Sequence, residues 1–374
     1  MKTLILTCNT GEGHNSCAAA IKDIFERNGE QCELRDSLRF SSGLLSSFIA
    51  FGHVCIYRHM PGLFNKGYNV TENHGSFFKK GSLLYKILTS GAEKLYKYID
   101  SNGFDSIICV HPFAALLVTE MRSRFNTDIP ASIVATDYTC VPSTSDSEMD
   151  RYFIPHSDLV GEFVNCGIPA EKVIVSGIPV KERFFTVNTT HNARSILGLP
   201  VDKKILLMCC GSMGCGPMKR LSADLRELSD ENSLIIVICG NNNKLYKKLI
   251  KKQSKNFYVV GYTDKMYEYM QACDIFVTKP GGVSTTECLM LSKPMVFINA
   301  VGGCEQRNYD FFERSGCVAT AKSNDAIPEL AMNLLADRAG CDTLSAKMRS
   351  YFSKSNAAEF IYSNLTGNTD KNRL

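Results

Sequence analysis

The sequence predicts an α/β protein of two open domains with a cleft between them, each domain a parallel sheet with helices on both faces. Its 374 residues, 44% of them hydrophobic, are enough for two domains that each bury a core. Short β-branched apolar runs alternate with helical patterns, which favours parallel sheets. A polar stretch without periodicity at residues 186–195 marks the boundary. We therefore expect an amino-terminal domain at 1–185 and a carboxy-terminal domain at 196–365.

The amino-terminal domain follows the order strand, loop, helix. Its predicted strands are residues 3–7, 106–110 and 131–135. A glycine loop and a helix over 18–25 follow the first strand, and a helix over 114–122 follows the second. Buried strands separated by helices indicate βαβ units. The third strand ends at Thr136 and Asp137.

The carboxy-terminal domain repeats this pattern. Its predicted strands are residues 205–210, 234–239, 257–260, 275–278, 295–298 and 318–320. Residues 357–365 form a last helix, and 366–374 a frayed tail. Open α/β sheets bind ligands outside the carboxyl ends of their strands, so the loops after the strands are the candidate sites.

Charge and apolar patterning exclude several classes of protein. With 42 basic and 38 acidic residues, the net charge of +4 is too balanced for a nucleic-acid binder. The first eight residues reach glycine too soon for a signal peptide, and no apolar stretch is long enough to span a bilayer. We expect a protein of the cytoplasm, peripheral on the cytoplasmic face of the cell membrane. The 16 cysteines lack any C-x-x-C pair and favour buried apolar roles over disulfides or a zinc site.

Residues 44–98 depart from the α/β pattern. They interleave many aromatic residues with seven basic and only two acidic ones. Such an insertion is suited to anionic lipid headgroups, where each Lys or Arg contributes roughly 1 kcal/mol. The alternative is a solvated basic face over an ordinary core.

The first candidate site is the loop at 10–15, between the first strand and the first helix. Its glycines allow a ligand close to the backbone, and the helix amino terminus favours anions. Ser16 stands where a dinucleotide-binding loop has its third glycine, so an NAD site is not indicated. The helix dipole keeps His14 neutral and able to accept a proton. Alternatively, His14 only caps the helix.

The second and third candidate sites follow strands of the carboxy-terminal domain. Gly211, Ser212 and Gly214 lie in a glycine-rich turn suited to pyrophosphate, or form a plain tight turn. The strongest pattern is the segment 274–288. There Ser284 or Thr285 is expected to cap a helix that carries Glu287 on its first turn. Such a carboxylate can accept hydrogen bonds from both hydroxyls of a ribose. Alternatively, it only stabilises the helix through its interaction with the helix dipole.

Two further groups of polar residues complete the set. Glu305, Gln306 and Asn308 follow the next strand and carry groups that bind sugar hydroxyls, although residues at a helix start also bind backbone. In the amino-terminal domain, Asp137 is placed to orient His14 or an acceptor, or to form a turn. His111 follows another strand of the same domain and is similarly placed.

With these loops in this order, the chain resembles the monogalactosyldiacylglycerol synthase and processive diacylglycerol glucosyltransferase family. These are relatives of the enzyme that adds N-acetylglucosamine to make lipid II. The resemblance runs from Thr3 to about Ala321. It implies the GT-B architecture of two facing Rossmann-like domains. It also implies a lipid acceptor on the amino-terminal half and a nucleotide sugar held mainly by the other half.

The resemblance also implies roles for single residues. Gly13 and His14 match the family's Gly-Gly-His loop, which makes His14 the candidate base. Residues 279–282 and Glu287 match its nucleotide-sugar motif, with Glu287 on the ribose. The donor-binding positions that it implies, together with the glycine-rich turn, are Gly13, Gly211, Ser212, Gly214, Gly240, Asn241, Tyr262, Met266, Lys279, Gly281, Gly282, Ser284, Thr285, Glu287, Glu305, Gln306 and Asn308.

The chain departs from the family in two places. The family usually has Pro-Gly-Gln-Glu where this chain has Gly-Gly-Cys-Glu at 302–305, so Cys304 replaces an amide that contacts the sugar. The stretch after Asp137 lacks the His and Trp common in the galactolipid and glucolipid enzymes, and this chain has no Trp. The donor sugar and the acceptor therefore stay open.

The expected function is inverting transfer of a hexose from a UDP-sugar to a lipid such as diacylglycerol at the membrane surface. His14 is the expected base, and backbone amides with the Ser284 or Thr285 hydroxyl hold the pyrophosphate. The scheme needs no metal and no cofactor besides the donor substrate. Two alternatives stay open: a UDP-sugar 2-epimerase and a non-catalytic UDP-sugar-binding protein. The sequence does not indicate an oligomeric state.

Overall fold

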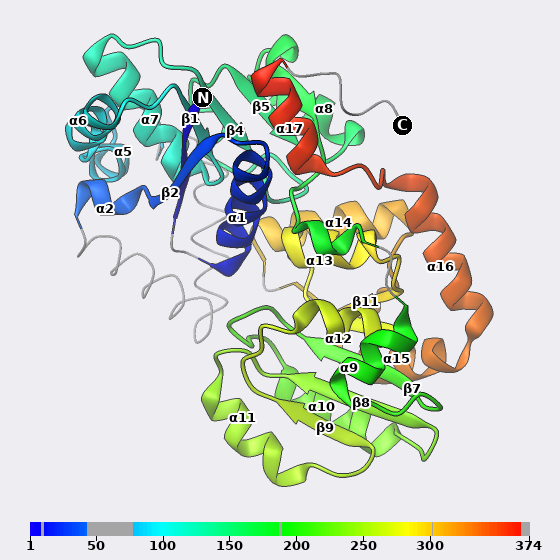
Figure 1. Cartoon of the computed structure of the whole chain (residues 1–374). Coiled ribbons are helices and arrows are strands. Elements are labelled where there is room, and N and C mark those ends of the chain that lie inside the picture. The colour runs from blue at the N-terminus through cyan, green and yellow to red at the C-terminus, as the bar shows by residue number, and fades with distance from the viewer. Residues whose placement is uncertain (9–10, 43–77, 187–188, 301, 368–374) are drawn as a thin grey trace. The chain divides into compact units, whose positions relative to one another are not determined.

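The structure is a computed structural model that describes residues 1–8, 11–42, 78–186, 189–300 and 302–367. The chain forms two compact units (Figure 1). Unit 1 comprises Met1–Lys181, Gly302–Cys304 and Ser355–Leu374. Unit 2 comprises Glu182–Val301 and Glu305–Lys354. The domain boundaries expected from the sequence, 1–185 and 196–365, stay predictions.

Unit 1 is built on a six-stranded sheet in the order β2-β1-β3-β4-β5-β6, with every neighbouring pair parallel. Its strands are β1 (Lys2–Thr7), β2 (Gln31–Asp36), β3 (Ser106–Cys109), β4 (Ala131–Val134), β5 (Arg151–Ile154) and β6 (Val173–Val175). All residues of β3 and β4 are buried, because helices cover both faces of the sheet.

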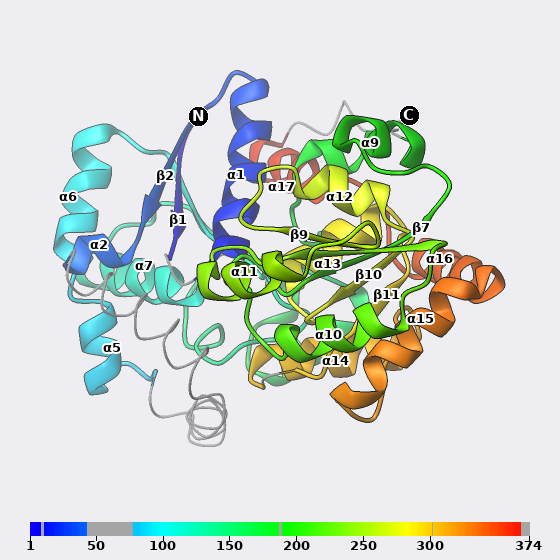
Figure 2. The same ribbon diagram turned by 90° about the horizontal axis from the view of Figure 1, so that it is seen from below.

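Helices lie on both sides of this sheet, with α1 and α17 on one side and α6 and α7 on the other (Figure 1; Figure 2). The helices of unit 1 are α1 (Glu12–Arg27), α2 (Leu38–Ser41), α5 (Leu83–Leu88), α6 (Ala92–Asn102), α7 (Pro112–Phe125), α8 (Val160–Asn165) and α17 (Ala357–Thr366), with short 3-10 turns η1 (Ser157–Leu159) and η2 (Ala170–Lys172).

The last helix of the chain packs on the first. The rings of Phe25 in α1 and Tyr362 in α17 lie edge to face, with centroids 5.1 Å apart. Arg27 pairs with Glu359 at 2.5 Å. The helix α17 therefore covers the apolar side of α1 and belongs to unit 1, although the chain reaches it only after unit 2.

Unit 2 is built on a five-stranded parallel sheet in the order β11-β10-β7-β8-β9. Its strands are β7 (Lys204–Cys209), β8 (Ser233–Ile238), β9 (Phe257–Val260), β10 (Ile275–Thr278) and β11 (Met295–Phe297). Its helices are α9 (Thr190–Leu197), α10 (Met218–Leu228), α11 (Asn243–Leu249), α12 (Met266–Ala272), α13 (Gly282–Met290), α14 (Cys304–Ser315), α15 (Ile327–Ala336) and α16 (Arg338–Tyr351), with 3-10 turns η3 (Glu182–Phe184), η4 (Ile250–Lys252) and η5 (Asn324–Ala326).

The two faces of the unit 2 sheet carry different helix pairs. The helices α9 and α12 pack together on one face, and α10 and α15 pack together on the other (Figure 2). The core between the sheet and α10 and α15 includes Leu206, Ile235, Leu225 and Ile327, all almost fully buried. The parallel sheet brings the carboxyl ends of all five strands to one edge, where the candidate donor loops begin.

The two parallel sheets with helices on both faces confirm the predicted α/β fold class. One predicted strand is wrong: residues 318–320 form only a single bridge, between Val296 and Ala319. Three strands were not predicted: β2, β5 and β6. The edge strand β2 mixes charged and apolar residues and is nowhere fully buried, so it lacks the apolar run of a central strand.

Most of the basic, aromatic insertion at 44–98 lies outside the described residues, which resume at 78. The described part forms α5 and the start of α6. The inner side of α5 packs Tyr85 and Leu88 against Leu38 and Leu116. Among the described residues, no helix combines the length and the apolar character that crossing a bilayer requires.

Candidate active site

His14 lies in the first turn of α1, at the carboxyl end of β1. Its Nδ1 lies 2.9 Å from the carbonyl oxygen of Val110 and 3.0 Å from the hydroxyl oxygen of Thr136. A carbonyl oxygen only accepts hydrogen bonds, so Nδ1 carries the proton and donates it. The lone pair of the neutral ring is then on Nε2. The loops after β3 and β4 thus fix the tautomer in which Nε2 can accept a proton.

His111 lies beside His14. It is the N-cap of α7, and its own Nδ1 accepts a hydrogen bond from the backbone N–H of Phe113 at 3.1 Å. The centroids of the two imidazole rings are 4.6 Å apart, with the ring planes at 65°. The His111 side chain is buried.

Burial is the largest influence on His14 and lowers its pKa from the ordinary value of 6.5. The charge of Asp137 acts in the opposite direction and raises that pKa. The sequence attributed a neutral His14 to the helix dipole, whereas the main cause here is loss of hydration. The nearby carboxylate stabilises the imidazolium once the ring has taken a proton.

The loop that carries Asp137 is anchored to α8. One carboxylate oxygen of Glu162 accepts hydrogen bonds from the Thr139 hydroxyl at 2.5 Å and from the Cys140 backbone N–H at 2.7 Å. The sequence placed Asp137 to orient His14 or an acceptor, or to form a turn, and in the structure its charge acts on His14. The hydroxyl oxygen of Thr136, which sequence reasoning missed, accepts a hydrogen bond from the His14 Nδ1. Its place at the end of a predicted strand, next to Asp137, was the available signal.

In unit 2 the loops after β7 and β8 pack backbone against backbone. The N–H of Asn241 donates to the carbonyl of Ser212 at 2.7 Å, and the Asn242 side chain donates to the carbonyl of Gly214 at 2.9 Å. Gly214 and Gly240 have φ of +55° and +54°. A Cβ on Gly214 would lie 2.1 Å from the Cys239 carbonyl oxygen, and one on Gly240 would lie 2.2 Å from that of Ser212. The loop pairing itself requires both glycines.

Lys279 and Glu305 join the loops after β10 and β11. The Lys279 Nζ lies 2.5 Å from a carboxylate oxygen of Glu305, and these side chains are 19% and 9% exposed. The amide of Asn308, which is fully buried, donates to the carbonyl of Pro280 at 2.9 Å. Glu305 and Asn308, two of the three residues predicted to contact the sugar, therefore also hold the 279–282 turn in place.

The start of α13 differs from the prediction. The helix begins at Gly282 with Gly281 as its N-cap, and no side chain caps it. Ser284 and Thr285 therefore lie inside the helix, and Glu287 lies on its second turn. The predicted cap is wrong because Gly281 already has the extended backbone of an N-cap.

The side chains of this helix divide between two environments. The Thr285 hydroxyl is buried and has no hydrogen-bond partner among the described residues. Ser284 and Glu287 are half-buried and, three residues apart, share one face of α13. The accessible groups at this helix start are therefore the Ser284 hydroxyl, the Glu287 carboxylate and the backbone amides.

The remaining predicted donor residues are more exposed. Tyr262 is 66% exposed in the loop after β9, and Met266 begins α12. The Gln306 amide donates to Asp310 at 2.8 Å on the surface of α14. Gly13 is exposed in the first turn of α1. All four residues lie in a loop or at a helix start that follows β1, β9 or β11.

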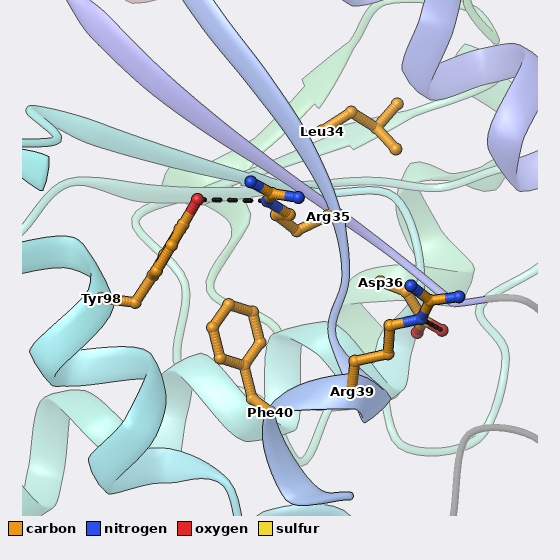
Figure 3. A pocket seen from close by; sticks show the side chains of 6 residues that line it. All are labelled: Leu34, Arg35, Asp36, Arg39, Phe40 and Tyr98. Carbon is orange, nitrogen blue, oxygen red and sulfur yellow. Dashed lines mark hydrogen bonds and ion pairs between the residues drawn. The ribbon is translucent and has the colours of Figure 1, made fainter. Parts of the chain in front are cut away.

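A separate hollow of about 280 Å³ lies beside the edge strand β2, between α2 and α6. Figure 3 shows Arg35 donating to the hydroxyl of Tyr98, at 3.1 Å, and Arg39 beside Asp36. Arg35 also pairs with Glu33. Each guanidinium thus has a carboxylate partner, and none of the predicted site residues lines this hollow. No cluster of ligands for a metal ion occurs among the residues that the structure describes.

Sequence comparisons divide the chain at the same place as the fold. Residues 14–180 match the model of the family described as monogalactosyldiacylglycerol (MGDG) synthase, and residues 217–357 match that of glycosyl transferases group 1. The chain is 25% identical to a processive diacylglycerol beta-glucosyltransferase of Bacillus cytotoxicus, over 96% of this chain and 92% of that protein. It is 26% identical to one of Bacillus cereus strain AH187, over 90% and 86%.

Solved structures share the fold of the whole chain. MurG of Acinetobacter baumannii superposes with a TM-score of 0.64 at 13% identity, over 98% of this chain and 99% of the other. The UDP complex of S. aureus MnaA gives 0.64 at 14% identity, over 98% and 96%. A UDP-GlcNAc 2-epimerase from Neisseria meningitidis gives 0.62 at 13% identity, over 98% and 100%.

At such low identity these likenesses establish the fold, and the fold is GT-B with two Rossmann-like halves. The matched families add the class of enzyme. The two family matches cover both halves, and the Bacillus relatives align along nearly the whole length. The chain is therefore a glycosyltransferase. Its two halves match the models of monogalactosyldiacylglycerol (MGDG) synthase and of glycosyl transferases group 1, and along nearly its whole length it is similar to processive diacylglycerol beta-glucosyltransferases.

Proposed function

We propose that this protein is an inverting glycosyltransferase that moves a hexose from a UDP-sugar to a lipid acceptor such as diacylglycerol. The observation that carries the proposal is the fixed tautomer of His14, whose Nδ1 is held by Val110 and Thr136. The relatives named diacylglycerol glucosyltransferases and the solved GT-B neighbours bound to UDP support the same substrates.

In unit 1, His14 acts as the general base. Its Nε2 removes the proton of the acceptor hydroxyl as the oxygen attacks the anomeric carbon of the donor. The bond from that carbon to the UDP oxygen breaks, and the configuration inverts. The Asp137 charge stabilises the imidazolium that forms. General-base assistance of this kind contributes roughly 10²–10⁴-fold to the rate.

In unit 2, the loops after the strands hold the donor. The backbone N–H groups at the start of α13 and the Ser284 hydroxyl donate hydrogen bonds to the pyrophosphate. These bonds stabilise the negative charge that grows on it as the sugar leaves. The Glu287 carboxylate accepts hydrogen bonds from the hydroxyls of the ribose. Lys279 adds a positive charge beside the same turn, while its pairing with Glu305 fixes its position. Tyr262 and Met266 are assigned to the uracil side.

A donor panel tests the proposal. The protein is incubated with lipid extract and with UDP-glucose, UDP-galactose or UDP-N-acetylglucosamine, and released UDP is measured. Release that needs both a lipid and one donor is expected. Isomerisation of UDP-N-acetylglucosamine without an acceptor would identify an epimerase instead. Binding of UDP without turnover on any lipid would identify a non-catalytic binding protein. The panel also identifies the sugar accepted beside Cys304.

The membrane-facing part of the proposal rests on α5. Leu83 and Ile87, four residues apart on its outer face, are 77% and 40% exposed. Lys79, Lys80 and Lys86 surround them and are exposed. Exposed apolar side chains among lysines favour the surface of an anionic bilayer. We assign this outer face of α5 as a membrane contact on the cytoplasmic side.

Flotation with vesicles tests this contact. The wild-type protein is expected to float with vesicles that contain anionic lipid, and the double variant Leu83→Glu/Ile87→Glu to float several-fold less. Leu228→Glu is the matched control, because Leu228 is also an exposed apolar side chain on a helix, at 49%. Equal flotation of the double variant and the control would remove α5 from the membrane contact.

A further inference from the structure

The ring of His111 is placed where it can control His14. The two imidazoles meet at 4.6 Å between centroids, with their planes at 65°. The residue before His111, Val110, supplies the carbonyl oxygen that accepts the proton of the His14 Nδ1. One short segment, the turn from β3 into α7, therefore contacts His14 through both a backbone carbonyl and a ring.

The capping bond fixes the protonation of His111 itself. Its Nδ1 accepts from the N–H of Phe113, so this nitrogen has no proton. A protonated His111 would have to give up that bond and leave the N–H without its cap. With Pro112 at the first position of α7, the N–H of Phe113 is the first one that the helix presents. The ring is thus held neutral, with its proton on Nε2.

Among the described residues, the other polar groups that face His14 come from the ends of two neighbouring strands. Asp137 and Thr136 face it from the loop after β4, and Val110 faces it from the end of β3. On its own helix, Glu12 is exposed. Among these described groups, His111 contributes a ring without charge. A ring of this kind excludes water from one side of His14 and adds no second positive charge when His14 takes a proton.

We propose that His111 is a positioning residue of the transferase: its capped, neutral ring holds His14 in the orientation in which Nδ1 donates to Val110 and Nε2 accepts the proton of the substrate. The inference rests on the proposed function of His14 as the base. It assigns His111 no contact with substrate. Without the ring, His14 gains room to turn and to exchange its bonds to Val110 and Thr136 for water.

The variant His111→Asn separates the ring from the cap, because Asn is among the best N-cap residues and keeps the bond to the helix. The matched control is His156→Asn. His156 caps the 3-10 turn η1 through its Nδ1, at 3.2 Å from the N–H of Asp158, and makes the same kind of bond. Both variants lose a capping imidazole, but only one of these rings contacts His14.

Kinetics and NMR give two independent tests. We expect His111→Asn to lower kcat roughly 10- to 100-fold with little change in either KM, since it disturbs orientation rather than binding. The acid limb of its kcat profile should move to higher pH, because water that reaches His14 weakens the effect of burial. Imidazole ¹⁵N spectra of the protein without substrate should show a single His14 tautomer in the wild type and a mixture in the variant.

The control His156→Asn should keep the wild-type kcat and the wild-type His14 signals. A His111→Asn protein with wild-type kcat and an unchanged His14 tautomer would overturn the inference. The NMR measurement needs no turnover, so it decides the role of His111 even if the variant is inactive. If the wild type itself shows no transfer, the proposed function fails, and the spectra still decide whether His111 fixes the His14 ring.

Discussion

The glycine loop of unit 1 and those of unit 2 look alike in the sequence but differ in what they require. A Cβ on Gly11 would meet no described atom within 4 Å, and its φ of 174° is extended backbone that any residue adopts. Gly214 and Gly240 have positive φ and would clash with backbone at 2.1 and 2.2 Å. The described fold requires glycine at 214 and 240 but not at Gly11. A glycine at position 11 is therefore consistent with a role in binding a ligand.

The loops of the two units also differ in their chemistry. In unit 1 a neutral, half-buried imidazole is held by neutral partners, and the charge of Asp137 acts on it. In unit 2 an ion pair of Lys279 and Glu305 and a paired set of loop backbones fix a helix start. The first arrangement suits transfer of a proton, and the second suits binding of an anion.

The largest expected effect is on turnover. His14→Ala should lower kcat/KM for acceptor and donor roughly 10²–10⁴-fold, because it removes the base and leaves unit 2 unchanged. UDP affinity, measured by calorimetry, should stay at the wild-type value. Activity within a few-fold of wild type would exclude His14 as the base and break the division between proton transfer and donor binding.

The next effect is on stability and compares the glycines directly. Gly240→Ala should lower the free energy of unfolding by about 2–4 kcal/mol, since its Cβ meets the Ser212 carbonyl and its φ is positive. Gly11→Ala should change it by less than about 0.5 kcal/mol. Denaturant unfolding measures both. If Gly11→Ala were as destabilising as Gly240→Ala, the contrast between the two loops would be lost.

The ion pair of unit 2 gives a third test. Lys279→Met should weaken UDP binding about tenfold and lower stability by about 2 kcal/mol, because it leaves the Glu305 carboxylate without its cation. Adding Glu305→Gln should restore most of the stability but not the affinity. Calorimetry with UDP and thermal unfolding separate the two effects. Restored affinity in the double variant would mean that Lys279 only neutralises Glu305.

The smallest effect concerns pH. The folded pKa of His14 is below 6.5, so the unfolded chain binds its proton first as pH falls. The contribution of the neutral His14 ring to the free energy of unfolding is therefore complete above pH 6.5 and is lost as pH falls from 6.5 to the folded pKa. His14→Asn should flatten this part of the stability curve.

The same titration should appear in activity. In the wild type, kcat should persist as pH falls through 6.5, and Asp137→Asn should shift the acid limb to still lower pH, because that carboxylate raises the pKa of His14. A shift to higher pH would show that Asp137 does not act through its charge on His14.

The sequence predicted the sheets better than it predicted the details of the site. Apolar runs such as 106–110 and 234–239 identify buried strands because burial on both faces leaves few positions for polar side chains. The edge strand β2 lacks that signal. The helix start at Gly282 was misplaced because a Ser or Thr near a helix start resembles a cap, while Gly281 supplied the cap conformation through its backbone.

Other features depend on contacts between residues far apart in the chain. The bond from His14 to Thr136 joins positions 122 residues apart, and the Lys279–Glu305 pair joins two different loops. The spacing of apolar residues along the sequence does not indicate which distant residues will form such pairs. The requirement for glycine at 214 and 240 likewise follows from two loops that touch, whereas the sequence left pyrophosphate binding and a plain tight turn open for the loop that carries Gly214.

The place of α17 has a consequence for how the protein is made. The helix that carries His14 buries Phe25 against Tyr362, which the ribosome adds only after all of unit 2. An amino-terminal half that emerges first cannot complete its own core and must keep that side of α1 uncovered through the rest of synthesis. The last helix therefore completes the unit that holds His14.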